Sequence, residues 1–286
     1  MKYRDAIRFM LFSTLSFAVM NALIKSLVHY HVFQLVFFRA LGTLCIVVFL
    51  LQKKQLSFWG HQKGLLIARG VVGTTSMFLF FLGVHYMTIG SAVTLRYLAP
   101  LFVALLSVVL FKKALLPPQW FFFGLAFLGV YLIKGFDPTA DLFGVIVVLF
   151  SALFSAGVYL LLSKIGTGDH PLVVVFYFML IATALGGIGS LFYGVPLQIK
   201  DTPQLLLLGV VGYFGQIFMT RAFQSGPAAQ IAPFKYVEVL FTLSIGVFYF
   251  QESYHFFHLL GTLLIILGLI LNIRYLALQK LNQTKA

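Results

Sequence analysis

Charged residues, and acidic residues above all, are scarce in this sequence. Its 286 residues include 7 Asp and Glu against 20 Lys and Arg, and charged residues make up 9% of the chain. A soluble domain carries about 25% charged residues, whereas here 61% of the residues are hydrophobic. No water-soluble fold can hide that much apolar surface, so the sequence predicts an all-α integral membrane protein in a lipid bilayer.

Cysteine is also scarce, and the motifs of known catalytic sites are missing. Cys45 stands alone, which excludes an intrachain disulfide. His255 and His258 are three residues apart with Glu252 one turn earlier, but they sit at the mouth of an apolar segment and make a poor metal site. No GxSxG, HExxH, P-loop or Rossmann pattern occurs in a suitable context. We therefore expect no metal, no cofactor and no enzymatic activity.

The excess positive charge lies between the apolar segments, which argues for membrane orientation rather than nucleic-acid binding. Lys134 and Lys200 fall on one side of the expected membrane. The other side holds Lys2, Arg4, Arg8, Lys53, Lys54, Lys63, Lys112, Lys113, Lys164, Arg274, Lys280 and Lys285. By the positive-inside rule, both termini are predicted in the cytoplasm, for a multi-pass protein of the cell (inner) membrane.

Ten apolar segments have roughly the 18–24 residues that a membrane-spanning helix needs. The first follows basic residues like a signal peptide, but no small-residue cleavage site precedes Asn21 and Lys25, so we interpret it as a retained helix. The predicted segments are 7–27, 32–51, 66–87, 89–111, 117–134, 143–163, 171–194, 203–222, 228–250 and 256–275.

The chain repeats itself after 138–139 residues. "LFSTLSFA" (11–18) lies on "LFSALFSA" (149–156), and "GVVG" (70–73) on "GVVG" (209–212). The same shift pairs Arg96 with Lys235 and Tyr97 with Tyr236. We therefore expect two five-helix repeats, residues 1–136 and 140–276, followed by a cytoplasmic tail, 277–286.

Because five is odd, the second repeat enters the membrane from the opposite side. The predicted fold is thus ten transmembrane helices as two inverted five-helix repeats. Inverted repeats are a transporter architecture, with the substrate near the midplane between the halves.

Three stretches resemble the EamA repeat of the drug/metabolite transporter superfamily. They are "FFRALGT" (37–43), "ARGVVGTTSMFLFFLGVHYMTIGSAVTLRYLAPLFVALLSVVLF" (68–111) and "FHLLGTLLIILGLIL" (257–271). The resemblance extends over nearly the whole chain. It implies ten helices, inverted repeats, a central cavity and secondary transport of small metabolites. S-adenosylmethionine uptake carriers are a more distant likeness.

Basic residues within the spans are the main candidates for substrate binding. Each costs about 2.5–3.5 kcal/mol at a helix centre. Arg96 and Lys235 lie roughly 10 Å below opposite membrane surfaces, and either line a cavity or snorkel to the nearer headgroups. Arg39 resembles the common helix-2 arginine of the family, and we expect a structural role for it.

Other polar residues accompany these cations. Tyr97 and Tyr236 either stack on a substrate or pack with satisfied hydroxyls. Asn21, which aligns with Tyr159, and Lys25 either reach the cavity or hold helices together. Pro100 and Pro233 are expected to kink their helices near the cations.

Glu238 is the one carboxylate within a predicted span. Three residues after Lys235, it either forms a structural ion pair with that lysine or serves as a proton-coupling candidate. Four cations against one carboxylate favour a small polar or anionic organic metabolite as substrate.

We therefore expect a secondary transporter working by alternating access. Its partners would be the metabolite, the lipid bilayer and either protons or another coupling ion. The alternatives are an S-adenosylmethionine-like or amino-acid/drug permease, a channel, and a non-transporting scaffold or lipid-handling protein. The sequence leaves the substrate, the direction of transport and the oligomeric state open.

Overall fold

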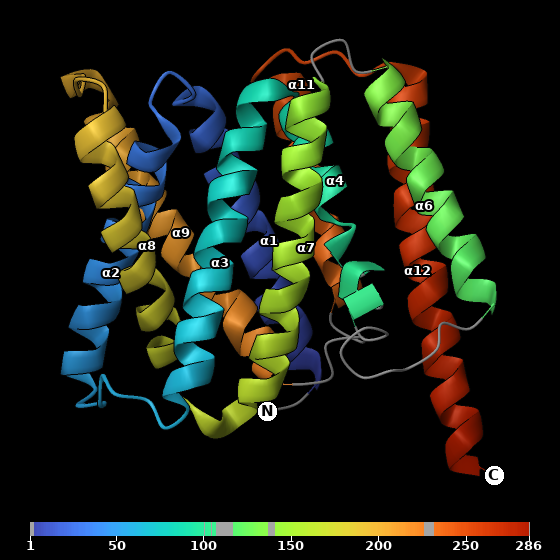
Figure 1. Cartoon of the computed structure of the whole chain (residues 1–286), viewed down its shortest axis with the longest axis horizontal. Coiled ribbons are helices and arrows are strands. Elements are labelled where there is room, and N and C mark those ends of the chain that lie inside the picture. Colours follow the sequence, from blue (N-terminus) through green and yellow to red (C-terminus); the bar gives the residue numbers. More distant parts are fainter. Residues whose placement is uncertain are drawn as a thin grey trace.

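The computed structural model of the chain describes residues 3–99, 101–103, 105–106, 117–136, 141–225 and 232–285. These residues form helices and their connections, without a strand (Figure 1). The elements are α1 (Tyr3–Ser26), α2 (Val32–Lys53), α3 (Lys63–Gly83), η1 (Val84–Tyr86), α4 (Ile89–Arg96), α6 (Pro117–Phe136), α7 (Leu142–Ile165), η2 (Gly166–Gly168), α8 (Pro171–Tyr193), η3 (Ile199–Asp201), α9 (Thr202–Gln224), η4 (Ala232–Tyr236), α11 (Val237–Phe248) and α12 (Phe256–Lys285).

The apolar helices are long enough for a multi-pass membrane protein. Six helical stretches meet the length and hydropathy of a membrane span: Asp5–Ser26, Val32–Lys53, Lys63–Tyr86, Leu142–Gly168, Pro171–Tyr193 and Ile199–Gln224. Two shorter apolar helices accompany them, Pro117–Ile133 and Phe256–Asn272. The all-α membrane class is confirmed. The count of ten spans stays a prediction, because residues 107–116 and 226–231 lie outside the described ranges.

Repeat-related residues start two of the helices in the same way. His31 is the N-cap of α2, and its side chain accepts a hydrogen bond from the Phe33 amide. His170, 139 residues later, is the N-cap of α8 and accepts from the Leu172 amide. Each cap satisfies an amide that the first helical turn leaves without a partner.

The helices pack into two bundles that each draw on both halves of the chain. In the first bundle α1 packs on α9 and α11, and α2 on α9. In the second bundle α7 packs on α3 and α4, and α8 on α3. Contacts of α2 with α8 and of α4 with α11 join the bundles, while α6 and α12 pair at one side (Figure 1). A central space between the bundles can therefore be lined by both halves.

The molecule has two ends, which we name from their positions in Figure 1. The upper end holds the connections 27–31 and 194–198, and the lower end holds 54–62 and the start of α8. α1 starts and α12 finishes at the lower end, whereas α7 runs from the upper end downwards. The Asp141 amide, just before α7, donates to the Tyr86 carbonyl at the upper end of η1.

Two of the expected spans are interrupted rather than continuous. α4 ends at Arg96 and is followed by a turn at Tyr97. The span expected over 228–250 instead has a 3-10 helix, η4, that gives way to α11 at Val237. Pro233 lies in η4, and Pro100 lies outside the described residues. In the other direction, α12 continues to Lys285, so the expected tail is helical over most of its length.

Candidate functional site

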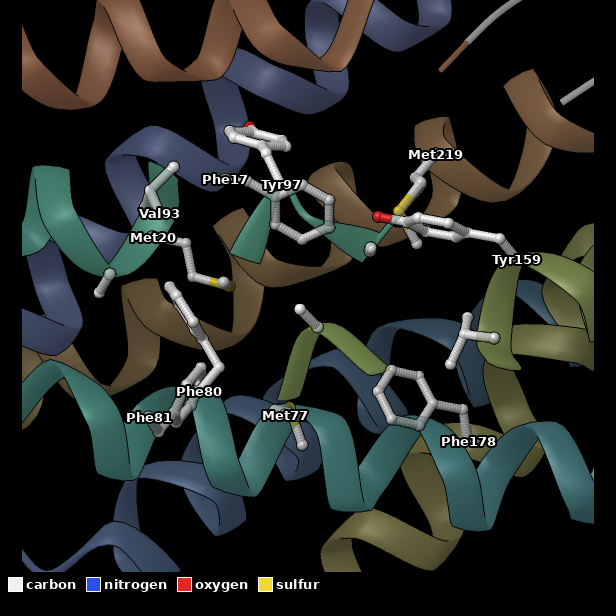
Figure 2. Packing of buried hydrophobic residues seen from close by; sticks show 14 of the residues in the cluster. Phe17, Met20, Met77, Phe80, Phe81, Val93, Tyr97, Tyr159, Phe178 and Met219 are labelled. Atoms are coloured by element: carbon white, nitrogen blue, oxygen red, sulfur yellow. The ribbon is translucent and has the colours of Figure 1, made fainter. Parts of the chain in front are cut away.

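A small cavity lies at the centre of the molecule, between the two bundles. It encloses about 40 Å³ and is lined by four basic side chains, Arg39, Arg69, Arg96 and Lys235, with aromatic and methionine side chains between them. A second space of about 10 Å³ shares Arg96 and Lys235 and adds Glu238. Figure 2 shows apolar and aromatic side chains of this region, among them Phe17, Tyr159 and Met219. A space of this size is large enough to hold water molecules.

Lys235 is buried at the junction of the two bundles. Its side chain is 6% exposed, and its Nζ donates a hydrogen bond to Tyr159 Oη at 2.9 Å. The ammonium also lies 5.2 Å from the centroid of the Tyr159 ring and 6.0 Å from that of Tyr97. Lys235 therefore points into the centre and does not snorkel towards a headgroup.

Arg96 lies beside Lys235, and its neighbour Tyr97 meets the repeat-related Tyr236. The Arg96 guanidinium carbon is 4.4 Å from the centroid of the Phe80 ring. The rings of Tyr97 and Tyr236 pack edge to face, with centroids 5.4 Å apart. The basic and aromatic pairs of both halves thus converge at one place in the fold.

Glu238 bonds to Asn21 rather than to Lys235. Asn21 Nδ2 donates to Glu238 Oε1 at 3.1 Å, and both residues are buried. The ion pairs among the described residues are Arg8–Asp5 and His29–Asp201, so of the two alternatives for Glu238 the ion pair with Lys235 is wrong. The three-residue spacing crosses from η4 into α11, where the geometry of a regular α-helix does not hold.

Arg39 and Arg69 were not expected at the cavity. The sequence favoured a structural role for Arg39 and did not single out Arg69 as a candidate. Both are buried in the cavity wall, where Arg39 Nη1 lies against the sulfurs of Met77 and Met179. A signal for Arg69 was present: a Cβ at Gly73 would collide with its Nη1, so a glycine one turn along makes room for the guanidinium.

Lys25 lies away from the cavity, at the upper end. Its Nζ donates to the Met87 carbonyl at 2.9 Å and to the Val84 carbonyl at 3.4 Å. The lysine of α1 thus caps carbonyls at the end of η1. Asn21, one turn earlier on the same helix, faces Glu238 instead.

The histidines near the upper end are also structural. His258 is 1% exposed rather than at an open mouth, and its Nε2 lies 2.7 Å from Ser91 Oγ. Glu252 accepts a hydrogen bond from the Ile89 amide at 3.1 Å. In the described part of the chain, no group of three or more His, Cys, Asp or Glu is placed to hold a metal ion.

The arrangement is suited to binding an anion. Among the described residues, four basic side chains and one carboxylate face the two central spaces. In a space that excludes most water, hydrogen bonds between an anion and such cations are about twice as strong as neutral ones.

Comparison with known proteins agrees with a transporter. The model of the EamA-like transporter family matches residues 5–135 and again 142–274. The chain is 29% identical over 263 residues to the pseudopaline exporter CntI of Pseudomonas aeruginosa strain UCBPP-PA14, which covers 90% of this chain and 92% of that protein. It is 25% identical over 262 residues to human solute carrier family 35 member G1, covering 85% and 71%.

A solved crystal structure shares the fold. It superposes with a TM-score of 0.61 over 98% of this chain and 96% of its own, at 17% sequence identity. At that identity the match speaks for the fold alone.

Proposed function

Since this chain belongs to the EamA-like transporter family, and is accordingly a membrane transporter rather than an enzyme, we propose that it carries a small polar or anionic organic metabolite through the central cavity by alternating access. The observation that carries the proposal is the convergence of Arg96 and Lys235 on one space, which Tyr97 also lines and against which the Tyr236 ring packs through Tyr97. A buried cation in a membrane span is costly and marks a transport path.

The arrangement of the helices supports two inverted repeats. The repeat relates α1 to α7, α3 to α9 and α4 to α11. The α1–α9 contact therefore corresponds to α7–α3, and the α1–α11 contact to α7–α4, and all four contacts are present. α1 and α7 run in opposite directions in Figure 1. In this architecture the substrate site lies at the interface of the repeats, near the membrane midplane.

The two bundles provide the moving parts. Each bundle contains helices of both repeats, and the cavity lies between them. Tilting one bundle against the other would open the cavity at the upper or the lower end in turn. The breaks after Arg96 and before Val237 lie beside the substrate space, where discontinuous helices present backbone groups to a substrate.

Glu238 is the candidate for proton coupling. It is buried beside Arg96 and Lys235 and bonds to Asn21. A carboxylate in this position can exchange a proton when a substrate displaces its neighbours.

The lower end is assigned to the cytoplasm of a cell whose inner membrane holds the protein. The exposed cations Lys53, Lys54, Lys63 and Lys164 lie in or beside the connections of that end. The positive-inside rule places such a side inside the cell.

The test is a metabolite-library uptake screen with purified protein in liposomes. We expect uptake of a carboxylate- or phosphate-bearing metabolite, weakened about 10- to 100-fold in Arg96→Gln and Lys235→Gln, since each loses a charge-assisted hydrogen bond. Lys164→Gln, which removes an exposed cation, is the control. Uptake restricted to cationic metabolites would instead favour an S-adenosylmethionine-like permease. Transport unchanged in both cavity variants would refute the assignment of the site.

A further inference from the structure

Two arginines of the cavity wall are buried without the counter-ion that such groups require. Arg39 is 2% and Arg69 1% exposed, and the described residues lining the central cavity include no Asp or Glu. Arg69 Nε and Nη1 and Arg39 Nε have no hydrogen-bond partner among the described residues. A guanidinium stays charged in proteins, so burying it without an anion is costly.

The two guanidiniums are held at one place by a shared aromatic ring. The Arg69 carbon Cζ lies 4.1 Å and the Arg39 Cζ 5.4 Å from the centroid of the Phe178 ring, on α8. Like charges gathered on one ring repel each other, and the methionine sulfurs beside Arg39 are weak acceptors. Among the residues that the structure describes, the cluster therefore has no group that would neutralise it.

The repeated "GVVG" sequence makes room for both side chains. The last glycine of the first copy, Gly73, is the one whose Cβ would collide with Arg69 Nη1. The last glycine of the second copy, Gly212, would place its Cβ 3.3 Å from Arg39 Nε. The same motif position in each repeat thus accommodates one guanidinium.

We propose that Arg39 and Arg69 form an anion subsite, separate from the Lys235–Tyr159 pair, that receives a carboxylate or phosphate of the substrate. Guanidinium groups bind both anions through paired hydrogen bonds. Because the same cavity reaches Lys235, a substrate that fills it carries a second acidic group for that lysine. The inference rests on the proposed transport function and narrows its substrate class to compounds with two acidic groups.

The test measures anion binding directly, by the thermal stability of the purified wild-type protein in detergent. The probes are acetate, succinate and inorganic phosphate at matched ionic strength, with chloride as reference. We expect succinate and phosphate to raise the Tm of the wild type. In Arg39→Met and Arg69→Met the apparent affinity for these probes should fall about 10- to 100-fold, while the Tm without probe stays the same or rises, because an unpaired buried charge is removed. Arg221→Met, outside the cavity lining, is the control.

Comparing a probe with one carboxylate, acetate, with a probe that has two, succinate, distinguishes the arginine subsite from the lysine. Succinate reaches both subsites, so its binding should also weaken in Lys235→Met. Acetate occupies one subsite, so its binding should be lost either in the two arginine variants or in Lys235→Met, but not in both. Equal loss of acetate binding in all of them would refute two separate subsites.

A second set of variants displaces the guanidinium without removing it. Gly73→Ala should push Arg69 aside and weaken probe binding, while Gly64→Ala on the same helix, where a Cβ meets nothing within 4 Å, should not. Unchanged probe affinity in both methionine variants, or a lower Tm without probe in both, would overturn the subsite. The absence of any Tm shift in the wild type on addition of the probes would also overturn it. If the protein then took up a neutral or cationic metabolite, the transport function would hold and the anion subsite would not.

Discussion

Repeat-related residues connect the two bundles at the upper end and at the lower end of the molecule. At the upper end His85 Nε2 lies 3.4 Å from the Tyr30 carbonyl, and at the lower end Gln224 Nε2 donates to the Asp169 carbonyl at 3.0 Å. A shift of 139 residues relates both partners. Each contact ties the first bundle to the second.

The upper end adds a charged clamp that the described residues of the lower end do not match. Lys25 of the first bundle binds the carbonyls of Val84 and Met87 of the second. Its repeat-related counterpart Lys164 is exposed. The contacts that hold the bundles together are therefore stronger at the upper end than at the lower end. We expect opening of the lower end to cost less free energy.

The largest effect concerns which side of the membrane each end faces, because this outcome is all or none. We predict that both termini, and hence the lower end, face the cytoplasm. Reporter fusions at the C-terminus check this by activity on one side of the membrane only. A fusion active outside the cytoplasm would reverse the assignment of the two ends.

Breaking the clamp should change the upper end most. In Lys25→Met the hydrogen bonds from an ammonium to two carbonyls are lost, which favours upper-end opening by about 1.5–3 kcal/mol. The measurement is the rate at which a membrane-impermeant thiol reagent, added at the upper side, modifies Val158→Cys in the cavity wall of a Cys45→Ser protein. We expect a rise of about 10- to 100-fold. Lys164→Met is the matched control, and equal rates in both variants would show that Lys25 is no lock.

Loosening the lower end should have the smallest effect. Gln224 donates neutral hydrogen bonds to the Gly166 and Asp169 carbonyls at 2.7 and 3.0 Å. Gln224→Leu should favour lower-end opening by about 1 kcal/mol, which is roughly a fivefold faster modification of Val158→Cys from the lower side. Gln52→Leu, on an exposed part of α2, serves as control. An effect as large as that of Lys25→Met would show that the two locks are equal.

Sequence reasoning found the membrane class and the family because both depend on patterns spread over the whole chain. Hydropathy and the repeat need no knowledge of which side chains meet. The repeat alignment also picked out Tyr97 and Tyr236, whose rings meet in the structure. Their part in substrate binding stays a prediction.

The details that sequence reasoning missed depend on local geometry. An ion pair between Lys235 and Glu238 was one of two alternatives that α-helical spacing offered. The helix type changes between the two residues, so one reaches α7 and the other α1. Arg69 was not among the candidates, although it lies six residues into α3, which begins at Lys63. Its position in the cavity could be inferred only from the space that Gly73 leaves.

The small volume of the central cavity has a consequence for the membrane's energy supply. The cavity measures about 40 Å³ and is lined by four cations. A carrier that changes state around so small a space takes little solution with it, and the four cations disfavour the entry of free sodium ions. Movement between the two states without cargo would therefore leak little sodium across the bilayer.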